Sequence, residues 1–270
     1  MTEGVFNCLA DRQRTLAFGR AIRNTVRSGD VVVDLGSGSG IMALFAAKAG
    51  ARKVIAVERD IKNATWLEQI FSANGYGHII HVVNADARKV RLSQKADVII
   101  CEMIATGLIE ELQVPVMNHA LRFASPSTRI ILQTIHNSIE AVHVSNRFYG
   151  FDLPIPQYEY PGETQVKVVP ATRMYNYQSV SFTQVNKTRV NTVAGLPVIA
   201  TKPMVINGVR ISSRTDFCDG SSFDASFAYC YPIILPVSPI AVKMGDTIVC
   251  KLRYNMCNGF SGLRLNVFKQ

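Results

Sequence analysis

A glycine-rich turn that joins a buried strand directly to a helix constrains the fold of this chain most strongly. The mostly apolar run 31–35, VVVDL, passes into the sequence GSGSG at 36–40, and residues 41–49 then continue with helical character until Gly50. Glycines accept positive φ values and allow a ligand to lie against the backbone. A turn of this kind at the carboxyl end of a strand is where open α/β sheets bind their ligands.

Three carboxylates accompany this turn. Asp34 comes just before it, Glu58 ends the next apolar strand, and Asp86 follows the third strand, where it is next to Ala87. An acid in the position of Glu58 accepts hydrogen bonds from ribose hydroxyl groups. Asp34 can orient the methionine end of S-adenosylmethionine, and Asp86 can accept a hydrogen bond from an adenine amino group.

The turn alone fits either a nicotinamide dinucleotide or S-adenosylmethionine. Ile41 breaks the GxGxxG spacing that is typical of dinucleotide sites. Together with Asp34 and Asp86, this departure favours S-adenosylmethionine.

The texture of the sequence changes near residue 150. Strand and helix patterns alternate over 1–150, whereas 151–270 is rich in Val, Thr, Ser, Tyr and Phe and holds 9 of the 11 prolines. We therefore expect an α/β domain over 1–150, with a doubly wound and mostly parallel sheet, followed by a β-rich domain over 151–270.

Periodicity predicts the elements within these two domains. Helices are expected at 7–27, 41–49, 63–73 and 108–123, and Pro115 should either kink the last helix or lie in its first turn. Strands are expected at 31–35, 54–57, 79–83, 96–101, 129–133, 178–184, 204–212, 225–235, 247–253 and 262–268.

Charge and cysteine content set further limits. Lysine and arginine exceed the acids by 29 to 20, but they form no basic tail of the kind that binds nucleic acid. No cysteine pair has CxxC spacing, and the histidines at 78, 81, 136 and 143 have no partner cysteine or carboxylate at ligand spacing, so we expect no metal. We see no signal peptide, and no apolar stretch approaches the roughly 20 residues that span a bilayer. These features predict a cytoplasmic protein without membrane contact.

Two segments of the first half resemble one enzyme family. The sequence at 34–60, DLGSGSGIMALFAAKAGARKVIAVERD, closely resembles the cofactor-binding core of protein arginine methyltransferases, and CLADRQRTLAFGRAI at 8–22 resembles the helix before their first strand. FYGFD at 148–152 resembles the segment that enters their β-barrel, and PIAVKMGD at 239–246 resembles a segment late in that barrel. The resemblance implies an α/β domain followed by a β-barrel-like domain, and S-adenosylmethionine as the cofactor, with S-adenosylhomocysteine as its product.

The resemblance also implies roles for individual residues. Arg14 would pair with the methionine carboxylate, Glu58 would hold the ribose, and three glycines would line the cofactor, namely Gly36, Gly38 and Gly40. Glu102 and Glu111 match the two loop glutamates of the family.

Two glutamates suit the chemistry of arginine. A guanidinium group is always charged at neutral pH, so its nitrogen is a poor nucleophile. Paired carboxylates bind the cation, draw its positive charge away from the reacting nitrogen and align that nitrogen with the methyl group. We therefore expect N-methylation of arginine in a protein or peptide, with Glu102 and Glu111 as the catalytic residues.

The sequence departs from the family at the acceptor side. The family usually has Trp-Met-Gly-Tyr after the first glutamate, whereas residues 103–106 are Met-Ile-Ala-Thr. The Thr-His-Trp trio of the family's barrel falls near 227–229, Phe-Ala-Tyr, without the histidine. Only seven residues precede Cys8, so the helix that closes over the cofactor in the family is expected to be missing.

These departures keep two other hypotheses open. The basic balance favours a methyltransferase that acts on RNA or a small metabolite, with Arg88, Lys89 and Arg91 as the nearest basic cluster. The lost histidine favours a non-catalytic protein that binds S-adenosylmethionine and accompanies an active homologue. A homodimer or a partner methyltransferase subunit is compatible with each hypothesis.

Overall fold

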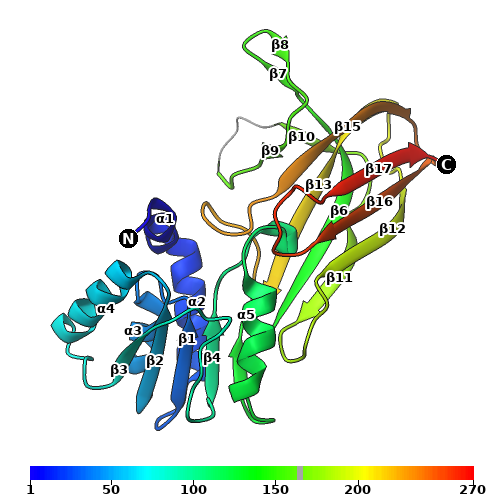
Figure 1. Cartoon of the computed structure of the whole chain (residues 1–270). Coiled ribbons are helices and arrows are strands. Elements are labelled where there is room, and N and C mark those ends of the chain that lie inside the picture. The colour runs from blue at the N-terminus through cyan, green and yellow to red at the C-terminus, as the bar shows by residue number, and fades with distance from the viewer. Residues whose placement is uncertain (163–166) are drawn as a thin grey trace.

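The fold combines a five-stranded parallel sheet with a seven-stranded and a three-stranded antiparallel sheet (Figure 1). The computed structural model describes residues 1–162 and 167–270. The parallel sheet has the strand order β3-β2-β1-β4-β5, with β1 Val31–Leu35, β2 Lys53–Glu58, β3 Ile80–Asn84, β4 Val98–Cys101 and β5 Arg129–Ile131. This order confirms the doubly wound sheet. The direction of winding reverses beside β1, which is where such sheets bind ligands.

The helices differ from the prediction at the N-terminus and before β5. They are α1 Glu3–Ala10, α2 Arg12–Thr25, α3 Ile41–Lys48, α4 Ile61–Ala73 and α5 Gln113–Ala120, with 3-10 turns η1 Thr106–Leu108 and η2 Leu121–Phe123. Pro115 lies in the first turn of α5, which is one of the two predicted outcomes. Within the described ranges, no helix has the length and apolar character needed to cross a membrane.

The helix predicted at 7–27 is two helices. Asp11 has extended backbone angles, φ −68° and ψ 91°, and its side chain accepts a hydrogen bond from the backbone N–H of Arg14. A carboxylate at this position caps the start of a helix, so α1 ends where α2 begins. Contrary to the expectation that no helix would close over the glycine turn, α1 lies over it: a Cβ placed on Gly38 would be 3.4 Å from a methyl group of Val5.

The rest of the chain forms antiparallel sheets. The seven-stranded sheet contains β6 Thr134–Val144, β9 Gln157–Tyr158, β10 Val168–Pro170, β11 Tyr175–Ser181, β13 Met204–Asp216, β14 Ser222–Phe223 and β15 Ile233–Val242. The three-stranded sheet contains β12 Arg189–Pro197, β16 Thr247–Asn255 and β17 Arg264–Lys269. No strand pairing in the described part of the chain closes these sheets into a barrel, so closure stays a prediction.

The change from parallel to antiparallel sheet comes early in the chain. β5 ends at Ile131 and β6, which begins at Thr134, pairs with β13 over nine residue pairs. The change therefore falls before the domain division predicted at residue 150, and that division stays a prediction. Of the strand predicted at 225–235, only the last three residues belong to β15, and the residues before them form a loop.

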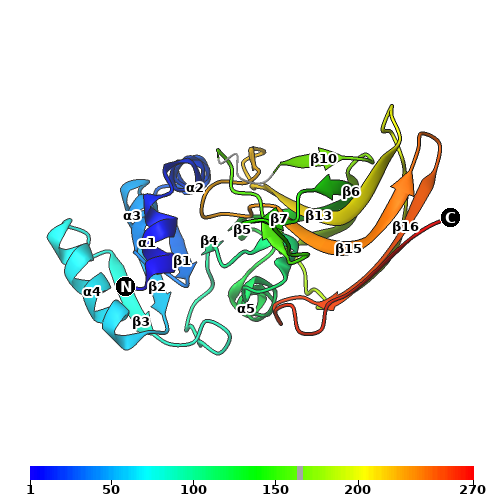
Figure 2. The same ribbon diagram turned by 90° about the horizontal axis from the view of Figure 1, so that it is seen from above.

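Aromatic side chains pack helix α2 against the antiparallel part. The ring of Phe18 lies 5.0 Å from Phe217 and 5.8 Å from Tyr229, and both contacts are edge-to-face. All three side chains are buried. This packing holds the middle of α2 against the antiparallel part. Figure 2 shows the parallel sheet and the antiparallel sheets side by side along the molecule.

Candidate functional site

A cavity of about 700 Å³ lies at the carboxyl ends of β1, β2 and β4. Helix α1 and the segment that leads into β15 form its other walls. Seven of the residues predicted from sequence line it: Arg14, Asp34, Gly36, Gly38, Glu58, Glu102 and Glu111. A second cavity, of about 730 Å³, is lined by residues of the antiparallel part and contains none of the predicted residues.

Three predicted residues do not line the cavity. A Cβ on Gly40 would lie 2.7 Å from Leu67 and 2.8 Å from Phe71, so Gly40 is required there by the packing of α3 against α4. Asp86 is paired with Arg88 at 2.6 Å, and this bond lowers the pKa of Asp86 to about 2. Its neighbour Ala87 is buried.

The glycine turn and Glu58 hold each other in place. The N–H groups of Gly36 and Ser37 both donate to the carbonyl of Val57, at 2.9 and 3.0 Å. One carboxylate oxygen of Glu58 accepts a hydrogen bond from the N–H of Gly38 at 3.0 Å. The turn is therefore tied to the end of β2, and Glu58 is held at the edge of the cavity.

Two buried polar atoms of the predicted site residues have no hydrogen-bond partner among the residues that the structure describes. They are Oδ2 of Asp34 and Nε of Arg14. Asp34 is only 3% exposed, and burial raises its pKa to about 7. Unpartnered buried groups are costly, which suggests a ligand that satisfies them. A ligand with both an ammonium and a carboxylate group, such as the methionine end of S-adenosylmethionine, has the complementary charges.

The other nitrogens of Arg14 are already bound. Nη1 donates to the carbonyl of Cys8 at 2.9 Å, and Nη2 forms an ion pair with the carboxylate of Glu102. The sequence resemblance placed Arg14 on the methionine carboxylate, and in the structure Nε is the Arg14 nitrogen that has no partner among the described residues. Arg14 thus connects the cofactor side of the cavity to the first of the two glutamates.

The buried side-chain amide of Gln113 holds the start of the loop that carries both glutamates. Gln113, which has no exposed surface, accepts a hydrogen bond from the N–H of Met103 at 2.9 Å and donates one to the carbonyl of Cys101 at 3.0 Å. These bonds fold the segment after β4 back onto the start of α5. As a result Glu102 and Glu111 line the same cavity.

The antiparallel part holds the middle of this loop. The hydroxyl of Thr106 donates to the carbonyl of Tyr231 at 2.6 Å, and the N–H of Gly107 donates to Ser213 at 2.8 Å. The hydroxyl of Tyr254 donates to the carbonyl of Gly107 at 2.6 Å. The position of the glutamates therefore depends on residues more than 100 positions later in the chain.

The cavity has a strongly acidic lining. Its lining residues include five carboxylates and one guanidinium, and the carboxylates are Asp34, Glu58, Glu102, Glu110 and Glu111. Burial, with the nearby Glu110, raises the pKa of Glu111. The lining contrasts with the formal net charge of +9 for the chain. A cationic group fits this cavity better than a phosphate does.

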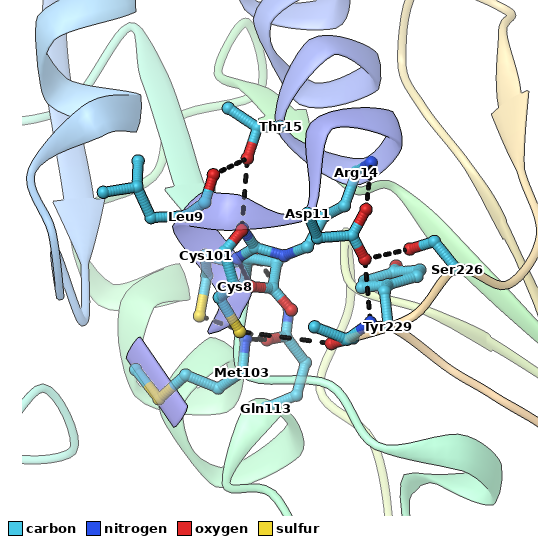
Figure 3. Close-up of polar contacts among 12 residues, drawn as sticks. Cys8, Leu9, Asp11, Arg14, Thr15, Cys101, Met103, Gln113, Ser226 and Tyr229 are labelled. Carbon is cyan, nitrogen blue, oxygen red and sulfur yellow. Dashed lines mark hydrogen bonds and ion pairs between the residues drawn. The ribbon is translucent and has the colours of Figure 1, made fainter. Parts of the chain in front are cut away.

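Asp11 is a residue that sequence reasoning missed. One oxygen of its carboxylate accepts hydrogen bonds from the hydroxyl of Ser226 at 2.6 Å and the N–H of Ala228 at 2.8 Å (Figure 3). Its other oxygen caps α2 through Arg14. Ala228 lies where the family's histidine was expected, so a backbone amide makes the contact there. Asp11 fell inside the helix predicted at 7–27, so its position before the start of α2 was visible only in the structure.

Aromatic side chains of the cavity were also missed. Tyr160, Phe227 and Tyr231 line it on the side of the antiparallel sheets. Their positions along the chain have no periodic pattern that would group them.

Across 1–162 and 167–270, no group of three or more His, Cys, Asp or Glu side chains is arranged to hold a metal ion.

Comparisons with known proteins agree with this geometry. Residues 15–150, half of the chain, match the family described as Ribosomal protein L11 methyltransferase (PrmA). An uncharacterized protein of Methanothermobacter thermautotrophicus is 33% identical over 261 residues, which is 97% of this chain and 96% of that protein. Histone-arginine methyltransferase CARMER of Drosophila persimilis is 35% identical over 126 residues, which is 46% of this chain but only 24% of the fly protein.

Solved structures share the fold over nearly the whole chain. The Trypanosoma brucei PRMT1 enzyme-prozyme heterotetrameric complex with AdoHcy matches with a TM-score of 0.79 and 19% identity, covering 97% of this chain and 95% of that one. Arabidopsis thaliana protein arginine methyltransferase 10 matches with a TM-score of 0.76 and the same coverage. At this level of identity the likeness concerns the fold.

Proposed function

The chain belongs to the S-adenosylmethionine-dependent methyltransferases, in the group that is similar to protein arginine methyltransferases, and on that premise we propose that it methylates arginine in a protein or peptide. The observation that carries this proposal is the acidic cavity, in which Glu102 and Glu111 lie beside the glycine turn. A cationic acceptor is attracted to these carboxylates, whereas the phosphates of RNA are repelled by them.

The residues around the turn would hold the cofactor. Arg14, through its free Nε, would bind the methionine carboxylate, and Asp34 would bind the ammonium group. Glu58 would accept hydrogen bonds from the ribose hydroxyls, and Gly36 and Gly38 would let the ligand lie against the backbone. A role for Asp86 would require its carboxylate to serve the adenine as well as Arg88.

The two loop glutamates would bind and polarise the acceptor. When bound, S-adenosylmethionine supplies a methyl group on a positively charged sulfur, which keeps the bonding electrons as the methyl leaves. Glu102, held by Arg14, would bind the guanidinium and draw its charge away from the reacting nitrogen. Glu111 would accept the proton that this nitrogen loses, and its raised pKa suits that task.

The names of the relatives support a protein acceptor. The matched family is described by ribosomal protein L11 and the fly relative by histone arginine, and both descriptions name proteins as the molecules modified. The basic surface cluster at Arg88, Lys89 and Arg91, which favoured RNA, does not line the cavity. In addition, Arg88 is already paired with Asp86.

A second copy or a partner subunit is proposed at the hairpin of β7 Arg147–Phe148 and β8 Phe151–Asp152. The hairpin projects from the molecule (Figure 1), and Tyr149 at its tip is 98% exposed. The trypanosome structure, by its title, is a heterotetramer. We expect the Tyr149→Ser, Phe151→Ser double variant to lower the molar mass measured by light scattering.

Transfer of radiolabelled methyl groups to an arginine-bearing peptide tests the proposed activity. We expect the wild-type chain to label the peptide, and Glu102→Gln and Glu111→Gln each to lower turnover at least about a hundredfold. Glu68→Gln, an exposed glutamate on α4, is the matched control and should leave turnover unchanged.

Calorimetric binding of S-adenosylhomocysteine separates loss of chemistry from loss of the cofactor site. Binding that survives in both loop variants would support the assigned roles. Normal turnover in both variants would contradict the proposal. Label in RNA that is absent from the peptide would instead favour the nucleic-acid hypothesis.

A further inference from the structure

Three aromatic side chains on the C-terminal side of the cavity lie close together. The ring of Tyr160 is 4.7 Å from Tyr231 and 6.2 Å from Phe227, and all three line the cavity. Tyr158 supports them from behind, with its ring 6.4 Å from Tyr160 and 5.8 Å from Tyr231. Tyr158 itself does not line the cavity.

The cluster leaves aromatic surface open toward the cavity. Phe227 is 52% exposed, although it lies within 7 Å of another ring, and Tyr160 and Tyr231 are only partly buried. Exposed aromatic surface beside a concave, charged site marks a place where a ligand packs.

Carboxylates lie beside the same rings. Glu110 and Glu111 line the cavity together with the aromatic cluster, and Glu110 is near enough to contribute to the raised pKa of Tyr231. A cation in this space can therefore donate hydrogen bonds to carboxylates while a ring covers its face. A planar, weakly hydrated guanidinium suits this arrangement better than a compact, strongly hydrated ammonium.

We propose that Tyr160, Phe227 and Tyr231 form an aromatic wall that stacks on the guanidinium of the acceptor arginine and sets the preference for arginine over lysine. This inference rests on the proposed function and adds specificity residues to it.

The wall is held in position from both sides of the cavity. The carbonyl of Tyr231 accepts the hydrogen bond from Thr106 in the glutamate loop. The residues on either side of Phe227 are bound by the carboxylate of Asp11. Wall and carboxylates are thus fixed relative to each other before the acceptor arrives, which reduces the entropy lost on binding.

Steady-state kinetics on matched arginine and lysine peptides test the wall. For Phe227→Leu and Tyr160→Leu we expect the KM of the arginine peptide to rise roughly three- to tenfold, as expected for loss of a cation–π contact, with kcat within twofold. Phe227→Trp, which keeps an aromatic ring at this position, should have the KM of the wild type for the arginine peptide. Tyr175→Leu, an aromatic residue of β11 that is 43% exposed and outside the cavity, is the control and should match the wild type.

A binding measurement keeps the wall apart from the chemistry. Fluorescence anisotropy of the labelled arginine and lysine peptides, with S-adenosylhomocysteine at saturation, should show that Phe227→Leu weakens arginine binding and narrows the difference between the two peptides. A wild-type KM in both leucine variants, or a loss of kcat at unchanged KM, would overturn the wall while leaving the proposed function intact. A wild-type chain that binds S-adenosylhomocysteine but neither binds nor labels the arginine peptide would overturn both.

Discussion

The buried amide of Gln113 offers a sharp test of how the catalytic loop is held. Substitution by methionine keeps the length and shape of the side chain but removes both polar atoms. The N–H of Met103 and the carbonyl of Cys101 then lose the hydrogen bonds of 2.9 and 3.0 Å that they share with Gln113. The site has no exposed surface at Gln113, so water cannot easily replace the amide.

The expected loss of stability follows from these two bonds. Each neutral hydrogen bond contributes about 1 kcal/mol net, and a buried group left without a partner costs about 1–3 kcal/mol. We therefore expect Gln113→Met to lower the free energy of unfolding by about 2–4 kcal/mol. For a chain of this size that corresponds to a fall in Tm of roughly 5–15 °C.

The functional effect should exceed the effect on folding. Glu102 directly precedes Met103, so a loop that relaxes moves a carboxylate away from the acceptor. A displacement of about 1 Å can lower a rate about a hundredfold. We expect kcat/KM for an arginine peptide to fall at least tenfold, measured well below the Tm of the variant.

Asn118 provides the matched control on the same helix. Its amide likewise makes one donated and one accepted hydrogen bond, both of 2.8 Å, with the backbone of Asn186. Asn118→Leu should lower Tm but leave kcat/KM within about threefold of wild type. A Gln113→Met variant with lowered Tm and wild-type kcat/KM would refute the reasoning, because the glutamates would then be held by other contacts.

Three further substitutions test other parts of the site. Asp34→Asn should raise Tm in the absence of cofactor more at pH 8 than at pH 5. The pKa of Asp34 is about 7 in the fold and lies above the ordinary carboxyl value, so the stability of the wild type falls as pH rises from that ordinary value to about 7. A Tm gain that is independent of pH would contradict this. Gly40→Ala should cost about 2–4 kcal/mol by chemical denaturation, since φ is +79° and the new methyl group meets Leu67 and Phe71; a wild-type denaturation midpoint would show that α4 gives way easily. Ser226→Ala should lower stability by about 1–3 kcal/mol through the lost bond to Asp11, and an unchanged Tm would mean that Ala228 alone suffices.

The parallel sheet was predictable because its signals are local. Its buried strands are mostly apolar runs, as in β4 and in β1, where Asp34 is the one polar residue, and a glycine or polar residue ends most of them. The split of the first helix was missed because Asp11 fits a helical pattern by composition. Only its extended backbone and its cap on Arg14 show the break.

The central strand β6 was missed for a physical reason. Asn137 and Glu140 are buried in it, which breaks the apolar alternation that predicts a strand. Their hydrogen-bond and ion-pair partners, Ser213 and Arg210, are about 70 residues further along the chain. Burial of these polar groups is costly without those partners, and the local sequence contains no signal of where the partners lie.

The candidate site likewise contains residues that local motifs predict and residues that only long-range contacts bring together. The glycine turn, Glu58 and the two loop glutamates stand in motifs that can be read along the chain. The bridge from Asp11 to Ser226 joins residues 215 positions apart, and the aromatic wall draws on two separate segments. Such contacts arise from the way the antiparallel part packs against α2, which no local pattern records.

The opposite signs of the cavity and of the whole chain have a consequence for the kinetics of encounter. At low ionic strength, where the screening length is about 30 Å at 0.01 M compared with about 8 Å at physiological salt, a polycationic peptide meets the repulsion of a protein with a net charge of +9 before it reaches the cavity. Attraction begins only when a single cation reaches the mouth of the cavity, close to Glu110 and Glu111. Added salt should therefore speed the approach of arginine-rich tails yet weaken their capture. An isolated arginine among neutral or acidic neighbours approaches without that barrier, so the charge distribution favours solitary arginines in such surroundings over densely basic tails.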